Sequence, residues 1–146
     1  MFVTDAPRLD RQVCFALYSA SRAATAVYRP VLEELGLTYP QYLVMLVLWE
    51  NEPRGVKDLG HELGLDSGTL SPLLKRLEAL GLVERRRSGD DERRVAVHLT
   101  PAGKDLSSKA GAIPQRLADA AGLTAGELEQ LRGTLAKLTA ALHGAV

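Results

Sequence analysis

The chain has 146 residues, of which 46% are hydrophobic and 25% are charged, which is the composition of an ordinary globular protein. Its 18 basic and 18 acidic residues cancel, so a nucleic-acid partner would require the basic residues to gather on one face. No apolar run approaches the roughly 20 residues that span a bilayer, and residues 1–11 lack the apolar core of a signal peptide. We therefore expect a cytoplasmic protein without a membrane partner.

Cysteine and histidine are too few and too scattered for a metal site with the usual ligand spacing. The single cysteine, Cys14, excludes an intrachain disulfide and a cysteine-based zinc site. The histidines, His61, His98 and His143, lie far apart in the sequence. We expect neither a metal nor a cofactor.

The first third of the sequence predicts two helices. Apolar residues recur at helical spacing over residues 9–35, and Gly36 is well placed to end that helix. Thr38 and Gln41 form a capping box for the next helix, residues 42–50. This second helix is apolar almost all round, so we expect it in the middle of the core.

Two short helices joined by a turn come next. The first ends at Gly64, and the second begins with Asp66 or Ser67 as its cap and runs to Leu80. The apolar stripe of the second helix consists of Leu70, Leu73, Leu77 and Leu80. Two short helices around a glycine-containing turn are typical of the helix-turn-helix motif.

The sequence after this motif predicts a β-hairpin and then helices. Residues 82–87 and 95–99 read as strands around a polar tip, which is the arrangement called a wing. We expect a mainly α fold with a small hairpin, a winged helix-turn-helix over about residues 37–100 of one domain. The terminal helices, about 1–36 and 101–146, are amphipathic, and we expect them to form a dimerisation platform.

The surface opposite the leucine stripe has the residues expected of a DNA-reading helix. Small and hydroxyl side chains allow close approach to a groove, and cations further along reach phosphates. The helix residues that we expect to contact DNA are Ser67, Gly68, Thr69, Ser71, Pro72, Lys75 and Arg76. The hairpin residues that we expect to contact DNA are Arg85, Arg86, Arg87, Asp91 and Arg93. We expect the arginine at the tip, Arg93, to enter the minor groove and the neighbouring acid, Asp91, to orient it. The alternative is a solvated hairpin with surface ion pairs.

These motifs resemble the multiple-antibiotic-resistance regulator (MarR) family. The wing pattern that carries the resemblance is Gly81-Leu82-Val83, Asp91-Glu92-Arg93, Leu99-Thr100 and Gly103. Within that family the chain is more closely similar to the organic hydroperoxide-resistance regulators (OhrR). The segments that carry this closer resemblance are residues 13–19, Tyr28, residues 36–50 and residues 66–78.

The resemblance implies a repressor that binds DNA and whose N-terminal cysteine senses organic hydroperoxides, oxidation weakening DNA binding. It places Cys14 at the sensing position and Tyr28 and Tyr39 as its two hydrogen-bonding tyrosines. A second, resolving cysteine is missing from this chain. The resemblance is therefore to the one-cysteine type, in which an external small thiol captures the oxidised sulfur as a mixed disulfide.

The residues themselves add a constraint on the sensor. Cys14, Tyr18 and Tyr28 share one helix face with two further hydroxyl residues, but fourteen residues of helix span about 21 Å. If Cys14 and Tyr28 serve one site, Tyr28 must come from the partner of a homodimer, whose symmetry predicts a pseudo-palindromic operator in double-stranded DNA. Two alternatives remain: a thiol peroxidase using Cys14, and a regulator that binds a small phenolic ligand with Cys14 merely structural.

Overall fold

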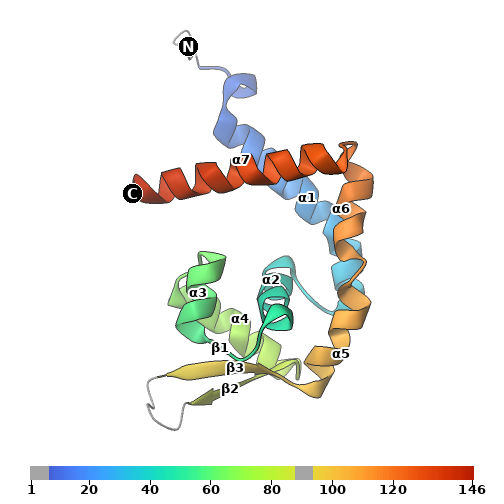
Figure 1. The fold of residues 1–146 in the computed structure, drawn as a ribbon, viewed down its shortest axis with the longest axis vertical. Coiled ribbons are helices and arrows are strands. Elements are labelled where there is room, and N and C mark those ends of the chain that lie inside the picture. The colour runs from blue at the N-terminus through green and yellow to red at the C-terminus, as the bar shows by residue number, and fades with distance from the viewer. Residues whose placement is uncertain (1–6, 88–93) are drawn as a thin grey trace. The chain divides into compact units, whose positions relative to one another are not determined.

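The computed structural model describes residues 7–87 and 94–146 and forms two compact units, Met1–Gly111 and Ala112–Val146 (Figure 1). The first unit holds α1 to α5 and a small antiparallel sheet, and the second holds α6 and α7. The expected mainly α fold with a hairpin is confirmed. None of the helices in the described part of the chain is long and apolar enough to cross a membrane.

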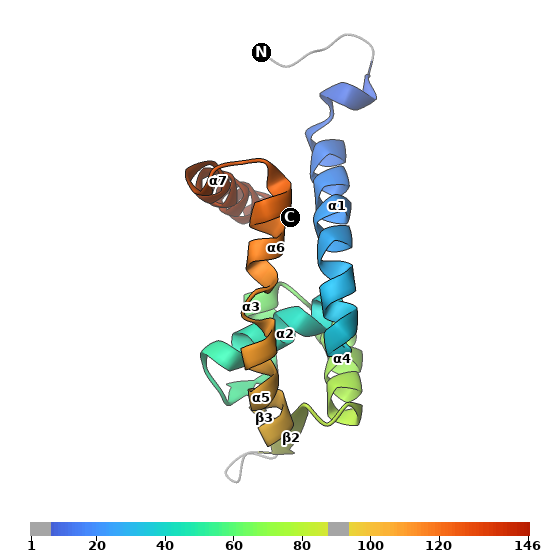
Figure 2. The same cartoon turned by 90° about the vertical axis from the view of Figure 1, so that its right-hand side faces the viewer.

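Helix α1, Val13–Leu35, follows a single 3₁₀ turn at Leu9–Arg11. It ends at Gly36, whose φ of 74° is the left-handed conformation that glycine adopts without strain. The first turns of α1 extend beyond the other elements of the first unit, as both views show (Figure 2). This placement explains why Val13 remains 63% exposed and Phe15 41% exposed.

Helix α2, Tyr39–Glu50, is the centre of the first unit's core. The capping box predicted at its start is present: the Thr38 hydroxyl accepts from the Gln41 backbone N–H, and the Gln41 side chain accepts from the Thr38 N–H at 3.0 Å. Its buried apolar residues are Tyr42, Val44, Met45, Val47 and Leu48. The prediction of a core helix is thus confirmed.

Helices α3, Val56–Leu63, and α4, Ser67–Ala79, are joined by a turn in which Gly64 has a φ of 68°. The hairpin consists of β2, Val83–Arg87, and β3, Val95–Leu99, close to the predicted strands. A third strand that the sequence did not predict, β1 at Arg54–Gly55, pairs antiparallel with β3 and gives the order β1-β3-β2.

Three hydrogen bonds fix the start of helix α5, Pro101–Ala110, and the end of the strand before it. The Thr100 hydroxyl caps it by accepting from the Gly103 N–H at 3.0 Å. The Trp49 indole N–H donates to the Gly103 carbonyl at 2.9 Å, so α2 and α5 are held together. The Leu99 N–H donates to the Glu52 carboxylate at 3.2 Å, which fixes the end of β3 beside α2.

The second unit consists of α6, Ile113–Ala121, and α7, Ala125–Gly144. Thr124 and Glu127 form a second capping box, with bonds of 2.9 and 3.1 Å. In the single chain none of the residues of α7, all of them described, is buried, and Leu131 and Leu142 are 46% and 53% exposed. The leucine-rich face of this amphipathic helix is therefore only partly covered in one chain.

Candidate functional site

The start of α4 is fixed by its cap. Of the two predicted caps, Asp66 is the one used: its carboxylate accepts from the Thr69 N–H at 2.8 Å. This backbone hydrogen bond is the main cause that holds the pKa of Asp66 below its ordinary value. Asp66 is therefore ionised at neutral pH and gives the helix a well-defined first turn.

One face of α4 is buried and the other is open. The buried face consists of Leu70, Leu73, Leu74 and Leu77. The prediction that Leu80 belongs to this face is wrong: α4 ends at Ala79, and Leu80 is 50% exposed while Leu74 is fully buried. The predicted reading residues on the other face are all exposed, namely Ser67, Gly68, Thr69, Ser71, Pro72, Lys75 and Arg76.

The three consecutive arginines of β2 do not form one surface, because side chains alternate along a strand. The Arg85 guanidinium lies 2.6 Å from the Glu78 carboxylate, which also accepts from the Arg85 backbone N–H at 3.3 Å. Arg86 pairs with Glu84 at 3.1 Å and is exposed, as is Arg87. The pairing with Glu78, which sequence reasoning missed, makes Arg85 a link between hairpin and α4.

Two of the predicted hairpin residues, Asp91 and Arg93, lie outside the described residues. Arg86 and Arg87 are both exposed and belong to β2, the strand that Arg85 links to α4. Their predicted contact with DNA stays a prediction.

The predicted sensor residues fall into two places along α1. Cys14 is exposed in the first turn of the helix. Tyr18 is 59% exposed, and the Arg22 guanidinium lies 5.4 Å from the centre of its ring, a cation–π contact on the surface. Tyr28 lies four helical turns from Cys14, so one chain does not bring the two together.

Tyr28 and Tyr39, the two tyrosines that the resemblance paired, are brought together by the packing of α1 on α2. Their rings are stacked with centres 5.7 Å apart and an angle of 14° between the planes. Tyr42, which sequence reasoning missed although it lies one helical turn after Tyr39, packs edge-on against Tyr28 at 6.3 Å. Burial, with a smaller effect of Tyr39, raises the pKa of Tyr28, so its hydroxyl is a neutral hydrogen-bond donor at physiological pH.

Comparison with known proteins gives the family. A family model described as transcriptional regulator SarA/Rot matches residues 26–110. An organic hydroperoxide resistance transcriptional regulator of Bacillus subtilis is 46% identical over 139 residues, which is 95% of each chain. The chain belongs to the MarR/SarA-type family of transcriptional regulators.

Solved structures agree with this MarR/SarA-type assignment. A structure of reduced AbfR bound to DNA, a protein of Staphylococcus epidermidis, is 36% identical, with a TM-score of 0.76 over 92% of this chain and 94% of that one. The overoxidized AbfR bound to DNA is 39% identical, with a TM-score of 0.70 over 90% of this chain and 96% of that one. These relatives are transcriptional regulators and not enzymes, so the thiol peroxidase alternative is set aside.

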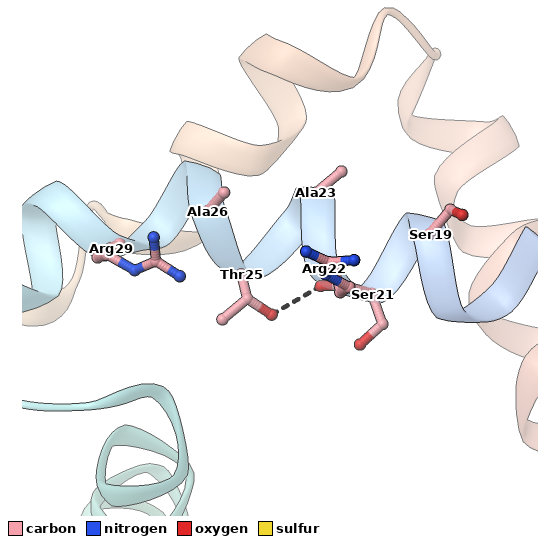
Figure 3. A pocket seen from close by; sticks show the side chains of 7 residues that line it. All are labelled: Ser19, Ser21, Arg22, Ala23, Thr25, Ala26 and Arg29. Carbon is pink, nitrogen blue, oxygen red and sulfur yellow. Dashed lines mark hydrogen bonds between the residues drawn. The ribbon is translucent and has the colours of Figure 1, made fainter.

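Helix α1 borders a hollow of about 560 Å³ (Figure 3). Its lining includes Arg22, Arg29 and Thr25, whose hydroxyl donates to the Ser21 carbonyl at 2.7 Å. All seven lining residues belong to this one helix, which cannot enclose a ligand by itself. Among residues 7–87 and 94–146, no cluster of histidine, cysteine or acidic side chains could hold a metal ion.

Proposed function

We propose that this protein is a transcriptional repressor that binds operator DNA through α4 and the β2–β3 hairpin. The observation that carries the proposal is the open polar face of α4 on a helix fixed on three sides: by the Asp66 cap, by its buried leucines and by the Glu78–Arg85 pair. Small side chains at the start of that face allow the backbone to approach base edges, and Lys75 and Arg76 lie further along, within reach of phosphates.

The proposed repressor works as a homodimer built from its terminal helices, about residues 1–36 and 101–146. The support for this is apolar surface at both ends of the chain: Val13 and Phe15 on α1, and Leu131 and Leu142 on α7, are between 41% and 63% exposed. Exposed apolar surface of this kind is stabilised when a second copy covers it. A homodimer is also typical of the family.

Cys14 is the proposed sensor of organic hydroperoxides. Its thiolate attacks the outer peroxide oxygen and the O–O bond breaks, which gives a cysteine sulfenic acid and an alkoxide; the alkoxide takes a proton from water and leaves as the alcohol. A small external thiol then attacks the sulfenic sulfur and releases water, which leaves a mixed disulfide on Cys14. The chain has a single cysteine, so an intrachain disulfide cannot form.

The hydrogen-bond donors for this chemistry are proposed to come from the partner subunit. Tyr28 and Tyr39 are stacked on each other, but Tyr28 is about 21 Å along α1 from Cys14 of the same chain. An antiparallel arrangement of two α1 helices would bring Tyr28 of the partner subunit to Cys14. A sensor shared between subunits would let its oxidation change the spacing of the two reading helices.

The form that releases DNA is proposed to be the mixed disulfide. The relative AbfR has been solved in an overoxidized form bound to DNA, so overoxidation is compatible with DNA binding in that protein. A thiol adduct adds bulk at the interface that oxygen atoms alone do not add, and packed interfaces tolerate added volume poorly. Release should therefore require both the hydroperoxide and the small thiol.

The proposal predicts a symmetric operator. Two reading helices related by a two-fold axis should protect two half-sites about one helical turn apart on the same face of the DNA, roughly 10 base pairs centre to centre. DNase footprinting on the upstream region of the protein's own gene, with native mass spectrometry of the complex, measures both the site and the number of chains. A single half-site bound by one chain would contradict the homodimer.

A further inference from the structure

A groove beside α4 shares Ser67 and Arg85 with the predicted reading residues, but its other lining residues have been given no role above. It has a volume of about 800 Å³ and lies where the start of α3, the start of α4 and the described base of the hairpin meet. Besides two valines, its lining residues are Gly55, Lys57, Asp58, Ser67, Arg85 and Arg94. Ser67 is also the first residue of α4, so the groove is continuous with the predicted reading face.

The charges of the groove favour an anion. Asp58, the one acid among these described lining residues, lies 3.4 Å from the Arg54 guanidinium, which also pairs with Glu62, so its charge is partly balanced outside the groove. Arg85 is held by Glu78 at 2.6 Å. Lys57 is exposed and takes part in none of the ion pairs found within the described part of the chain, which leaves its ammonium group available to a ligand.

The backbone at the start of α3 adds hydrogen-bond donors that also favour an anion. Helix α3 begins at Val56, and Gly55 before it has no side chain with which to cap the first turn. The backbone N–H groups of that turn therefore add to the positive charge of Lys57 on this side of the groove. In a helix-turn-helix, the first helix crosses the DNA backbone while the second enters the major groove, and α3 is that first helix.

We propose that this groove holds a phosphodiester group of the operator backbone, with Lys57 as its main cation. The inference rests on the proposed DNA binding and adds a contact to it. Because the contact is with a phosphate and not with a base, Lys57 should raise the affinity for every DNA sequence and leave the choice between sequences unchanged.

The test is the salt dependence of binding by the full-length protein, measured by fluorescence anisotropy with an operator fragment and with an unrelated duplex. For Lys57→Gln we expect the slope of log affinity against log salt to fall by about 0.9, and the affinity for both duplexes to drop several-fold by the same factor. Lys57→Arg should retain the wild-type slope. Lys109→Gln, which removes the same charge from an exposed position in the last turn of α5, is the matched control.

Two results would overturn the inference. If the salt slope of Lys57→Gln equalled that of Lys109→Gln, the phosphate contact would be excluded. Binding of DNA by the wild-type protein in the same experiment would still uphold the proposed function. A loss of affinity for the operator alone, with affinity for the unrelated duplex unchanged, would show that Lys57 reads bases and does not contact a phosphate. If the wild-type protein bound neither duplex, the proposed function itself would fail, and this contact with it. Inorganic phosphate added at constant ionic strength should compete weakly and equally with both duplexes, since the groove is proposed for a phosphate within a DNA strand.

Discussion

Replacing Gly103 with alanine is expected to lower the free energy of unfolding by about 3 kcal/mol, because the new side chain has no space. A Cβ atom there would lie 2.1 Å from the carbonyl oxygen of Leu82 and 3.3 Å from a methyl group of Leu99. The backbones of Leu82 and Gly103 cannot move apart without disturbing hydrogen bonds. The Leu82 carbonyl accepts from the Thr100 N–H at 3.1 Å, and the Gly103 carbonyl accepts from the Trp49 indole at 2.9 Å.

Thermal unfolding followed by circular dichroism measures this effect, which should appear as a Tm lower by on the order of 10 °C. Gly111→Ala is the matched control: its φ is −60°, and nothing lies within 4 Å of the added Cβ atom. That variant should be as stable as the wild type or more stable by up to about 1 kcal/mol. Equal Tm values for the two variants would contradict the packing described at the start of α5.

Replacing Cys14 with serine should abolish the response to hydroperoxide while operator affinity stays near that of the wild type. The hydroxyl nearly preserves the volume of the thiol but cannot form a sulfenic acid or a mixed disulfide. Because the two side chains are nearly the same size, the substitution should cost little stability. Anisotropy of a labelled operator, with hydroperoxide and a small thiol added, compares the two proteins. A Cys14→Ser protein that still released DNA would favour the alternative of a ligand-binding regulator.

The position of Tyr28 across the interface can be tested separately. Tyr28→Phe keeps the stack on Tyr39 but removes one donor, worth about 1 kcal/mol, and should slow oxidation several-fold. In a heterodimer of a Cys14→Ser chain and a Tyr28→Phe chain, the intact cysteine faces the intact tyrosine of the other chain. That cysteine should react at nearly the wild-type rate. A slow rate would place the pairing within one chain and contradict the shared sensor.

Local sequence was enough to predict most helix boundaries, because helix caps are made by neighbouring residues. Thr38, Thr100 and Thr124 each cap a helix that the sequence predicted. The end of α4 was set one residue too late, which put Leu80 in the core instead of Leu74. Both Leu74 and Leu80 fit an apolar stripe at helical spacing. Which of the two is buried depends on how α4 packs against the rest of the first unit.

Contacts between distant segments could not be predicted in the same way. Strand β1 is two residues long, and Arg54 pairs with Val97 across more than forty positions, which no local periodicity reveals. The Glu78–Arg85 pair joins the end of a helix to a strand, so it depends on the angle between them. The groove that contains Lys57 likewise forms only when α3, α4 and the hairpin meet.

The central claim, that oxidation of Cys14 controls DNA binding, is tested most directly by titrating the preformed complex of wild-type protein and operator with an organic hydroperoxide in the presence of a small thiol. The account predicts that DNA is released as each chain gains one thiol adduct, read by intact-protein mass spectrometry, and is bound again after reduction. It also predicts little release when the thiol is omitted. A complex that stayed bound while every Cys14 carried the adduct would contradict the account.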